Sequence, residues 1–279
     1  MEDRQRPIGV FDSGVGGLSV LRALCAELPL ERFVYMSDSG HAPYGERDEV
    51  FVSSRAHRIV DFLIDSHNIK SLVVACNTAT AAAIDKLRCA HPDLAIIGVE
   101  PALKPAATDT LTKRVGVMAT RSTLSSTKFE GLLSKVSQAY PQTQFVLQPC
   151  DGLASAIERA DTVAVETLIQ KYTNAMGQFG SMPGAIDSLV LGCTHYPFAA
   201  ETLRRFVGVD VRLLEPGVPV ARQTRRLLET QDLLADATPA NSVPVILGAT
   251  GHEGGLKQAA AQWLNWDLPV SLQMLPEVA

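Results

Sequence analysis

The sequence has no apolar run of the roughly 18 residues that a membrane-spanning helix requires. It also lacks a secretory signal, because the charged segment Met1–Pro7 is not followed by an apolar core. These two absences predict a cytoplasmic protein that has no membrane partner.

Positive charge is scarce relative to negative charge. The 279 residues include 25 lysines and arginines against 30 aspartates and glutamates, which gives a formal net charge of −5 and a pI of about 5.7. Nucleic-acid-binding domains usually carry a basic patch and have a high pI. The composition therefore argues against a nucleic-acid partner. The length is sufficient for one large domain or two ordinary ones with well-covered cores.

Cysteine occurs five times, at Cys25, Cys76, Cys89, Cys150 and Cys193. An odd number of cysteines in a cytoplasmic chain argues against a disulfide framework. The chain has no C-x-x-C pair of the kind that builds a structural zinc site. We therefore expect no metal, and each cysteine either fills the core or takes part in chemistry.

Short apolar runs alternate along the chain with longer segments of helical periodicity. This alternation is typical of parallel sheets covered by helices, and continuous apolar runs fit strands that are buried on both faces. The sequence therefore predicts an α/β fold with mainly parallel sheets flanked by helices. The expected helices include Leu18–Leu28, Asp48–Ser66 and Val218–Leu234. The expected strands are Ile8–Phe11, Phe33–Met36, Leu72–Ala75, Ala95–Val99, Val115–Met118, Phe145–Leu147, Leu189–Leu191, Val211–Leu214, Val243–Leu247 and Val270–Met274.

A glycine-rich turn follows the first expected strand, in "VFDSGVGGLS". Gly14 and Gly16 match the dinucleotide-binding spacing, but Ser19 stands where that motif has its third glycine. The turn is not a P-loop, because no Gly-Lys-Ser/Thr follows. Two interpretations remain open: Asp12 and Ser13 cap the next helix, or the backbone N–H groups of the turn bind an anion.

A polar loop, "SDSGHAPYGERDE" (Ser37–Glu49), follows the second expected strand. Most loops of this kind are ordinary surface connections. Here Tyr44 and Gly45 could offer a phenol and rigid backbone to a ligand.

Two segments repeat one pattern, in which an apolar strand runs into a cysteine and then into a helix. They are "LVVACNTATA" (Leu72–Ala81) and "LVLGCTHYPF" (Leu189–Phe198). Their cysteines, Cys76 and Cys193, are 193 − 76 = 117 residues apart, about one domain length. The partial positive charge of a helix N-terminus favours a thiolate or a bound carboxylate. Either copy alone fits a buried cysteine beside capping residues, whereas two matching copies favour a functional pair.

Two such thiols could face each other across a cleft between domains. One would remove a proton from one face of a stereocentre, and the other would return a proton to the opposite face. The ordinary pKa of a thiol, about 8.5, is near enough to neutrality for both states to be reached. This chemistry needs neither a metal nor pyridoxal phosphate. A different class stays open, a nucleophilic hydrolase that uses Cys193, His195 and Asp12.

Five motifs together resemble a known family. "IGVFDSGVGGLSVLRAL", "SDSGHAPYGER", "VVACNTATA", "IGVEPALKPA" and "LVLGCTHYPF" stand in the order and spacing of the glutamate racemases, the cofactor-independent branch of the aspartate/glutamate racemase family. The resemblance covers most of the chain, from Ile8 to the helix after Gly254. It implies two pseudo-symmetric α/β domains with the active site in the cleft between them. Residues 1–98 and 212–279 would form the first domain, and residues 99–211 the second.

The resemblance also implies a reaction, the interconversion of L- and D-glutamate without a cofactor, with the D-isomer feeding peptidoglycan synthesis. Cys76 would take the Cα proton from D-glutamate and Cys193 the one from L-glutamate. Asp12 would assist Cys76, and His195 would assist Cys193. The residues expected to contact the substrate are Asp12, Ser13, Tyr44, Gly45, Asn77, Thr78, Thr194 and His195.

Some positions carry weaker expectations. The resemblance gives Glu158 a supporting role, suggests that Thr120 and Ser122 reach a substrate carboxylate, and places Glu215 where an aspartate is usual. A homodimer is common in the family. Some members are credited with inhibiting DNA gyrase, and the sequence offers no evidence for or against that interaction. A near alternative is a related racemase that acts on aspartate.

Overall fold

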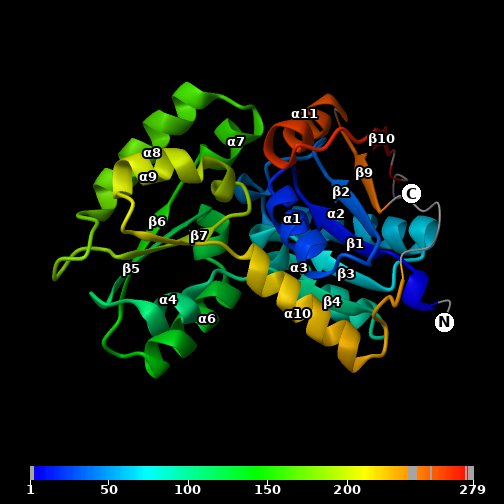
Figure 1. The fold of residues 1–279 in the computed structure, drawn as a ribbon, viewed down its shortest axis with the longest axis horizontal. Helices are drawn as coiled ribbons and strands as arrows, with labels where there is room; N and C mark the ends of the chain where they lie inside the picture. The colour runs from blue at the N-terminus through cyan, green and yellow to red at the C-terminus, as the bar shows by residue number, and fades with distance from the viewer. Residues whose placement is uncertain (1–2, 238–243, 252, 274, 276–279) are drawn as a thin grey trace. The chain divides into compact units, whose positions relative to one another are not determined.

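The computed structural model describes residues 3–237, 244–251, 253–273 and 275. The chain divides into two compact units, one made of Met1–Val99 with Gly217–Ala279 and the other of Glu100–Pro216. Each unit is built on its own sheet, and all the strand pairs in both sheets are parallel (Figure 1). The predicted α/β class with parallel sheets flanked by helices is confirmed.

The first unit contains a six-stranded sheet in the order β10-β9-β2-β1-β3-β4. Its strands are β1 (Ile8–Asp12), β2 (Phe33–Ser37), β3 (Ser71–Val74), β4 (Ala95–Gly98), β9 (Val245–Ala249) and β10 (Val270–Leu272). Its helices are α1 (Leu18–Glu27), α2 (Glu49–His67), α3 (Asn77–Ala90), α10 (Gly217–Thr230) and α11 (Glu253–Leu264), with short 3-10 turns η1 (Asp3–Gln5) and η2 (Tyr44–Glu46).

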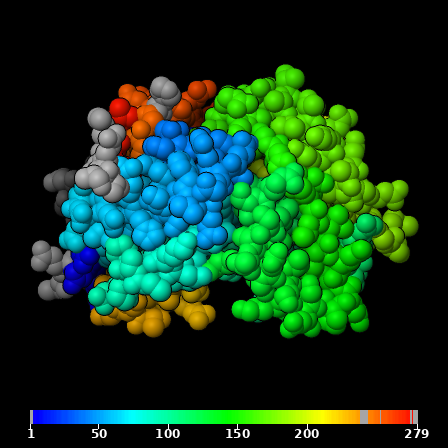
Figure 2. All heavy atoms as spheres, turned by 180° about the vertical axis from the view of Figure 1, so that it is seen from behind, coloured from blue at the N-terminus to red at the C-terminus, as the bar shows by residue number. Residues whose placement is uncertain are grey.

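Helices cover both faces of this sheet. Side chains alternate along a strand, so Val34 and Met36 of β2 share one face and pack in one cluster with residues of α2 and α3. Tyr35 points to the other face, where its hydroxyl lies near Gly17 at the start of α1, and α1 packs on α10. Figure 2 shows the outer surface of α2 and α3, coloured blue to cyan. The strands β1, β2 and β3 are buried along their whole length, as strands covered on both faces should be.

The second unit contains a four-stranded sheet in the order β6-β5-β7-β8. Its strands are β5 (Arg114–Ala119), β6 (Gln144–Pro149), β7 (Ser188–Gly192) and β8 (Arg212–Leu214). Its helices are α4 (Leu103–Asp109), α5 (Arg121–Leu124), α6 (Thr127–Ala139), α7 (Leu153–Glu158), α8 (Thr162–Met176) and α9 (Ala200–Val207), with the 3-10 turn η3 (Tyr196–Ala199). Val115 and Val117 of β5 pack with α4 and α6, whereas Gly116 between them lies against Met176 of α8.

The observed boundary between the units differs from the expected one by one residue at its first crossing, because Val99 lies in the first unit, and by more at the second. Residues 212–216 were expected in the first domain, but β8 pairs with β7 and so belongs to the second sheet. Residues 212–216 therefore lie in the second unit, which ends at Pro216. Among the expected strand ends, Val243 and Met274 lie outside the described residues. Within the described ranges, no helix combines the length and apolarity of a membrane span.

Candidate active site

In the first unit, the polar residues that follow the strands meet at one edge of the sheet. Asp12 ends β1, and the neighbouring strand β3 leads through Ala75 to Cys76. The amide of Ala75 donates to the carbonyl of Phe11 at 2.8 Å, which keeps the two chains side by side beyond the end of β3. The carboxyl edge of an open parallel sheet is where α/β proteins bind ligands.

Cys76 occupies the N-cap of α3. The amide of Ala79 donates to its sulfur at 3.4 Å, and the sulfur lies 3.8 Å from the hydroxyl oxygen of Ser13. Ser13 in turn donates to Oδ1 of Asp12 at 3.1 Å, and the amide of Gly14 donates to the same oxygen at 2.8 Å. A helix N-terminus favours negative charge on the sulfur. The contacts thus join the carboxylate of Asp12 to the thiol of Cys76 through one hydroxyl.

Asn77 follows Cys76 and is 5% exposed. Neither Nδ2 nor Oδ1 of its amide has a hydrogen-bond partner among the described residues. Buried side-chain amides are almost always hydrogen-bonded, so an unpaired one indicates a group that is satisfied by something else. Asn77 therefore offers both a donor and an acceptor at the residue that follows Cys76. Thr78, also buried, is the next residue of the same helical turn.

The loop that carries Tyr44 and Gly45 is held by Asp38, a buried residue that follows β2. The hydroxyl of Tyr44 donates to Oδ2 of Asp38 at 2.5 Å, and Arg55 donates to both carboxylate oxygens at 2.9 and 2.7 Å. Thr250, which follows β9, donates to Oδ1 at 2.5 Å. Burial alone raises the pKa of the Asp38 carboxyl, but the hydrogen bonds from Arg55, Thr250 and Tyr44 outweigh it and lower that pKa. The phenol of Tyr44, which we expected at the substrate, is thus engaged by Asp38.

The second unit places Cys193 directly after β7, in the turn before η3. Pro197 lies in the first turn of η3, where its missing N–H is tolerated. Nδ1 of His195 lies 3.7 Å from the sulfur of Cys193, and Nε2 lies 2.6 Å from Oε2 of Glu158. Glu158 is the last residue of α7.

The environment of His195 favours its protonated form. Burial lowers the pKa of the imidazole, but the hydrogen bonds with Cys193 and with Glu158 outweigh that effect and raise the pKa well above its usual value. An imidazolium next to a sulfur stabilises negative charge on that sulfur. Glu158 therefore contacts His195 directly, a closer role than the sequence suggested. Glu158 and His195 are 37 positions apart, so no local sequence pattern indicated that they are in contact.

The remaining expected positions in this unit lie near the same edge of its sheet. Thr194 is buried beside Cys193. Thr120 follows β5, the neighbour of β7, and caps α5 by accepting a hydrogen bond from the amide of Thr123 at 3.3 Å. Ser122 in the same short helix and Glu215 after β8 are half-buried.

The other cysteines have different surroundings. Cys89 is exposed on α3, and Cys25 is half-buried on α1. Cys150 is buried after β6, donates to the carbonyl of Gln148 at 3.3 Å, and has a pKa that burial raises, so it stays a neutral thiol. Among the described residues, no group of three or more His, Cys, Asp or Glu side chains is arranged to hold a metal ion.

Comparisons with known proteins show which family the chain resembles over most of its length. Residues 16–224 match the family model described as Asp/Glu/Hydantoin racemase. The chain is 43% identical over 242 residues to a glutamate racemase from Pseudomonas paraeruginosa. The matched region covers 86% of this chain and 88% of that relative. A glutamate racemase isoform from Bacillus anthracis superposes with a TM-score of 0.83 at 30% identity and covers 98% of this chain and 99% of its own. The Escherichia coli glutamate racemase, solved in complex with L-glutamate and the activator UDP-MurNAc-ala, gives a TM-score of 0.79 at 29% identity, with 96% and 98% covered.

Proposed function

Because this chain belongs to the Asp/Glu/hydantoin racemase family, we propose that it interconverts L- and D-glutamate. The similarity to enzymes named glutamate racemase, over most of both chains, supports glutamate as the substrate. One observation carries the mechanism. Each unit sets one buried thiol just beyond the carboxyl end of a central parallel strand, Cys76 after β3 and Cys193 after β7.

The proposed reaction moves one proton off Cα and another on. With D-glutamate, the thiolate of Cys76 takes the Cα proton, and the electron pair of that bond moves toward the α-carboxylate. The thiol of Cys193 then gives its proton to the opposite face of Cα. The product is L-glutamate, Cys76 is now a thiol and Cys193 a thiolate. The reverse reaction uses the same steps from the other side, so no atom or electron is consumed and no cofactor is needed.

Each thiol has its own assisting groups in the proposal. The carboxylate of Asp12 acts on Cys76 through Ser13, and the N-terminus of α3 favours the thiolate. The protonated His195, held by Glu158, favours a thiolate at Cys193. In the proposal, a helix N-terminus stabilises the thiolate in the first unit, and an imidazolium stabilises it in the second.

Substrate binding follows from the groups around the thiols. The unpaired amide of Asn77 supplies a donor and an acceptor, and the N-terminal turn of α3 suits a carboxylate. Thr78, Thr194 and the backbone at Ser13 and Gly45 complete the proposed contacts. The proposed reaction requires both thiols to act on the Cα of one glutamate. We also propose that the enzyme works in the cytoplasm without a cofactor, as a homodimer, and supplies D-glutamate for peptidoglycan.

A second candidate has one observation in its favour. Cys193, His195 and Glu158 are arranged as a nucleophile, a base and an orienting acid, the order found in cysteine hydrolases. That function would form an acyl-enzyme on Cys193 and would not need Cys76. The matched thiol in the first unit, and the family of the chain, favour the racemase.

The test is incubation of the purified protein, freed of metals and pyridoxal phosphate, with L-glutamate in D₂O. The racemase loses optical rotation and takes up deuterium at Cα in the same period. Folded protein that gives neither signal contradicts the proposal. The same assay with L-aspartate tests for the related racemase. The rates with the two substrates must be compared, because one methylene in a pocket changes transition-state binding by only about 1–3 kcal/mol.

A further inference from the structure

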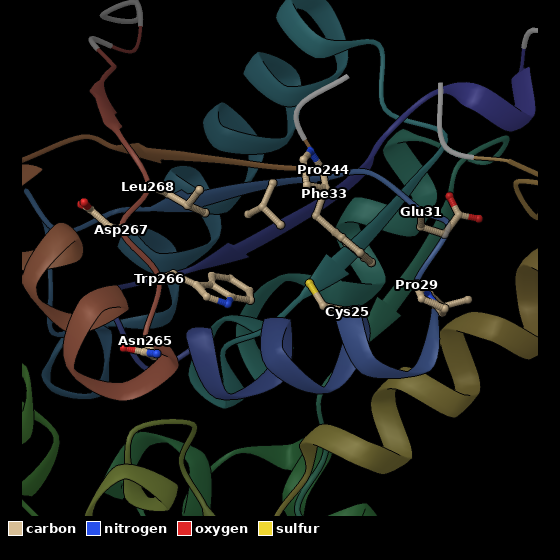
Figure 3. Close-up of a pocket in the computed structure, with 11 residues that line it drawn as sticks. Cys25, Pro29, Glu31, Phe33, Pro244, Asn265, Trp266, Asp267 and Leu268 are labelled. Atoms are coloured by element: carbon tan, nitrogen blue, oxygen red, sulfur yellow. The ribbon is translucent and has the colours of Figure 1, made fainter. Parts of the chain in front are cut away.

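The first unit contains a pocket of about 400 Å³ that does not involve the candidate active-site residues. It lies at the amino ends of β2 and β9, the sheet edge opposite to the one that Asp12 and Cys76 occupy. The end of α1 and the segment between α11 and β10 complete it (Figure 3). It is lined by Cys25, Leu28, Pro29, Glu31, Phe33, Pro244, Val245, Asn265, Trp266, Asp267 and Leu268.

The walls of the pocket are apolar where they face its centre. Cys25 comes from α1, Phe33 from β2, and Trp266 and Leu268 from the segment between α11 and β10 (Figure 3). Leu28 and Phe33 are buried in the core, whereas the ring of Trp266 is only half-buried. Trp266 thus lines the pocket with a ring that keeps part of its surface accessible, and aromatic rings stack well on other rings.

The charged groups that line the pocket do not favour an anionic ligand. Glu31 is paired with Nζ of Lys70 at 2.5 Å and accepts from the amide of Ala235 at 2.9 Å, so this carboxylate is already satisfied. The carboxylates of Glu31 and Asp267 point away from Cys25 (Figure 3). Burial raises the pKa of the Cys25 thiol to about 12, so the thiol stays neutral. None of the described residues that line the pocket carries a positive charge, so the lining offers a dicarboxylate such as glutamate no cationic side chain.

We propose that this pocket is a binding site for a neutral, aromatic small molecule that stacks on Trp266. Pockets that hold small organic ligands have volumes of about 300–1,000 Å³ and walls that are mostly apolar, and this one has both properties. The site is separate from the one proposed for glutamate, and its existence does not depend on the racemase activity.

The test uses N-phenyl-1-naphthylamine, a neutral aromatic probe whose fluorescence rises in apolar surroundings. The chain has two tryptophans, so a Trp263→Phe variant leaves Trp266 as the single emitter. We expect saturable binding of one probe per chain, with quenching of the Trp266 emission by energy transfer to the probe. Saturating glutamate should leave the probe bound. Absence of saturable binding, or displacement by glutamate, overturns the proposal.

Filling the pocket provides the decisive variant. Cys25→Phe should weaken probe binding at least about ten-fold, whereas the matched Cys89→Phe, at an exposed position on α3, should leave it unchanged. Trp266→Ala removes the stacking face from a connecting segment and should also weaken binding about ten-fold, read from the probe's own fluorescence. Thermal unfolding checks that each variant is folded. An unchanged affinity in a folded Cys25→Phe or Trp266→Ala protein overturns the proposal.

Discussion

At the scale of single residues, His195 connects the geometry of the second unit to its chemistry. Both of its ring nitrogens are occupied, one near the sulfur of Cys193 and the other bonded to Glu158. The motif "LVLGCTHYPF" was sufficient to predict the first contact, because the two residues lie two positions apart. The second contact depends on the packing of α7 against η3, which no local pattern encodes.

Glu158→Gln should make the stability of the protein depend less on pH. His195 holds its proton more tightly in the folded chain than in the unfolded one, because its folded pKa is raised. The resulting stabilisation is complete below the unfolded pKa of about 6.5 and is lost as the pH rises through the folded pKa. The wild type should therefore exceed Glu158→Gln in free energy of unfolding most clearly near pH 6, and the gap should shrink at higher pH.

Urea denaturation of both proteins at a series of pH values measures this gap. Glu166→Gln is the matched control, because Glu166 forms an exposed ion pair with Arg205 that does not involve a histidine. The control should show no such pH-dependent gap. A gap for Glu158→Gln that widens as the pH rises would contradict the assigned charge of His195.

The sequence did not indicate the contact between Tyr44 and Asp38. The loop motif suggested that the phenol of Tyr44 serves a ligand, but its hydroxyl donates to Asp38. Asp38 follows β2 and Arg55 lies on α2, so their pairing is decided by how that helix packs on the sheet. We interpret the contacts of Asp38 as the anchor that positions the Tyr44–Gly45 loop.

Arg55→Met should lower the free energy of unfolding by about 3–5 kcal/mol, because it leaves the carboxylate of Asp38 buried without its cation. Arg205→Met, which removes an exposed ion pair with Glu166, should cost no more than about 1 kcal/mol. Urea unfolding at neutral pH compares the two. Equal losses in both variants would show that Asp38 is not held as described.

At the scale of elements, apolar runs predicted the buried strands well. β1, β2, β3 and β7 lie within a residue or two of their expected bounds, because strands covered on both faces need continuous apolar sequence. β8 was also predicted to within one residue, but it was assigned to the wrong unit. It has only three residues, and nothing in them indicates which sheet they join, so its pairing with β7 had to be seen in the fold.

The start of α1 makes a close approach that only glycine allows. A Cβ on Gly17 would lie 2.6 Å from Cβ of Asp12 and 2.9 Å from the hydroxyl oxygen of Tyr35. Gly17→Ala should therefore displace Asp12, lower stability by about 1–3 kcal/mol and reduce turnover. Gly131 lies in the middle of α6 with nothing within 4 Å of such a Cβ.

Gly131→Ala is therefore the control, and it should raise stability by about 0.5–1 kcal/mol without changing turnover. Thermal unfolding and racemisation rates of both variants give the comparison. If Gly17→Ala proves as stable and as active as Gly131→Ala, the turn before α1 does not position Asp12.

At the scale of the whole molecule, the proposal assigns one reacting thiol to each unit, Cys76 to the first and Cys193 to the second. The sequence predicts this assignment from the two matching cysteine segments, and the structure places each of these cysteines just after a strand of its own unit. The boundaries of the units were harder to predict from the sequence. The chain forms the second unit between two segments of the first, and only the long-range pairing of β8 with β7 shows where the second unit ends.

The proposal places both thiols of one site in a single chain. An equal mixture of Cys76→Ser and Cys193→Ser, unfolded together and refolded so that subunits exchange, should therefore remain as inactive as either variant alone. The racemisation rate of the refolded mixture is the measurement, with refolded wild type as the control. Recovery toward a quarter of the wild-type rate, the most that random subunit exchange can restore, would mean that the two thiols come from different chains.

The most direct test of the account is the initial rate of L-glutamate racemisation by Cys76→Ser and by Cys193→Ser, each shown by circular dichroism to be folded. Loss of a positioned proton carrier costs a factor of about 10²–10⁴, and the account predicts a loss of that size in both variants. Cys150→Ser should keep the wild-type rate. Full activity in either Cys76→Ser or Cys193→Ser would contradict the two-thiol mechanism, and activity retained by Cys76→Ser alone would direct attention to the hydrolase arrangement around Cys193.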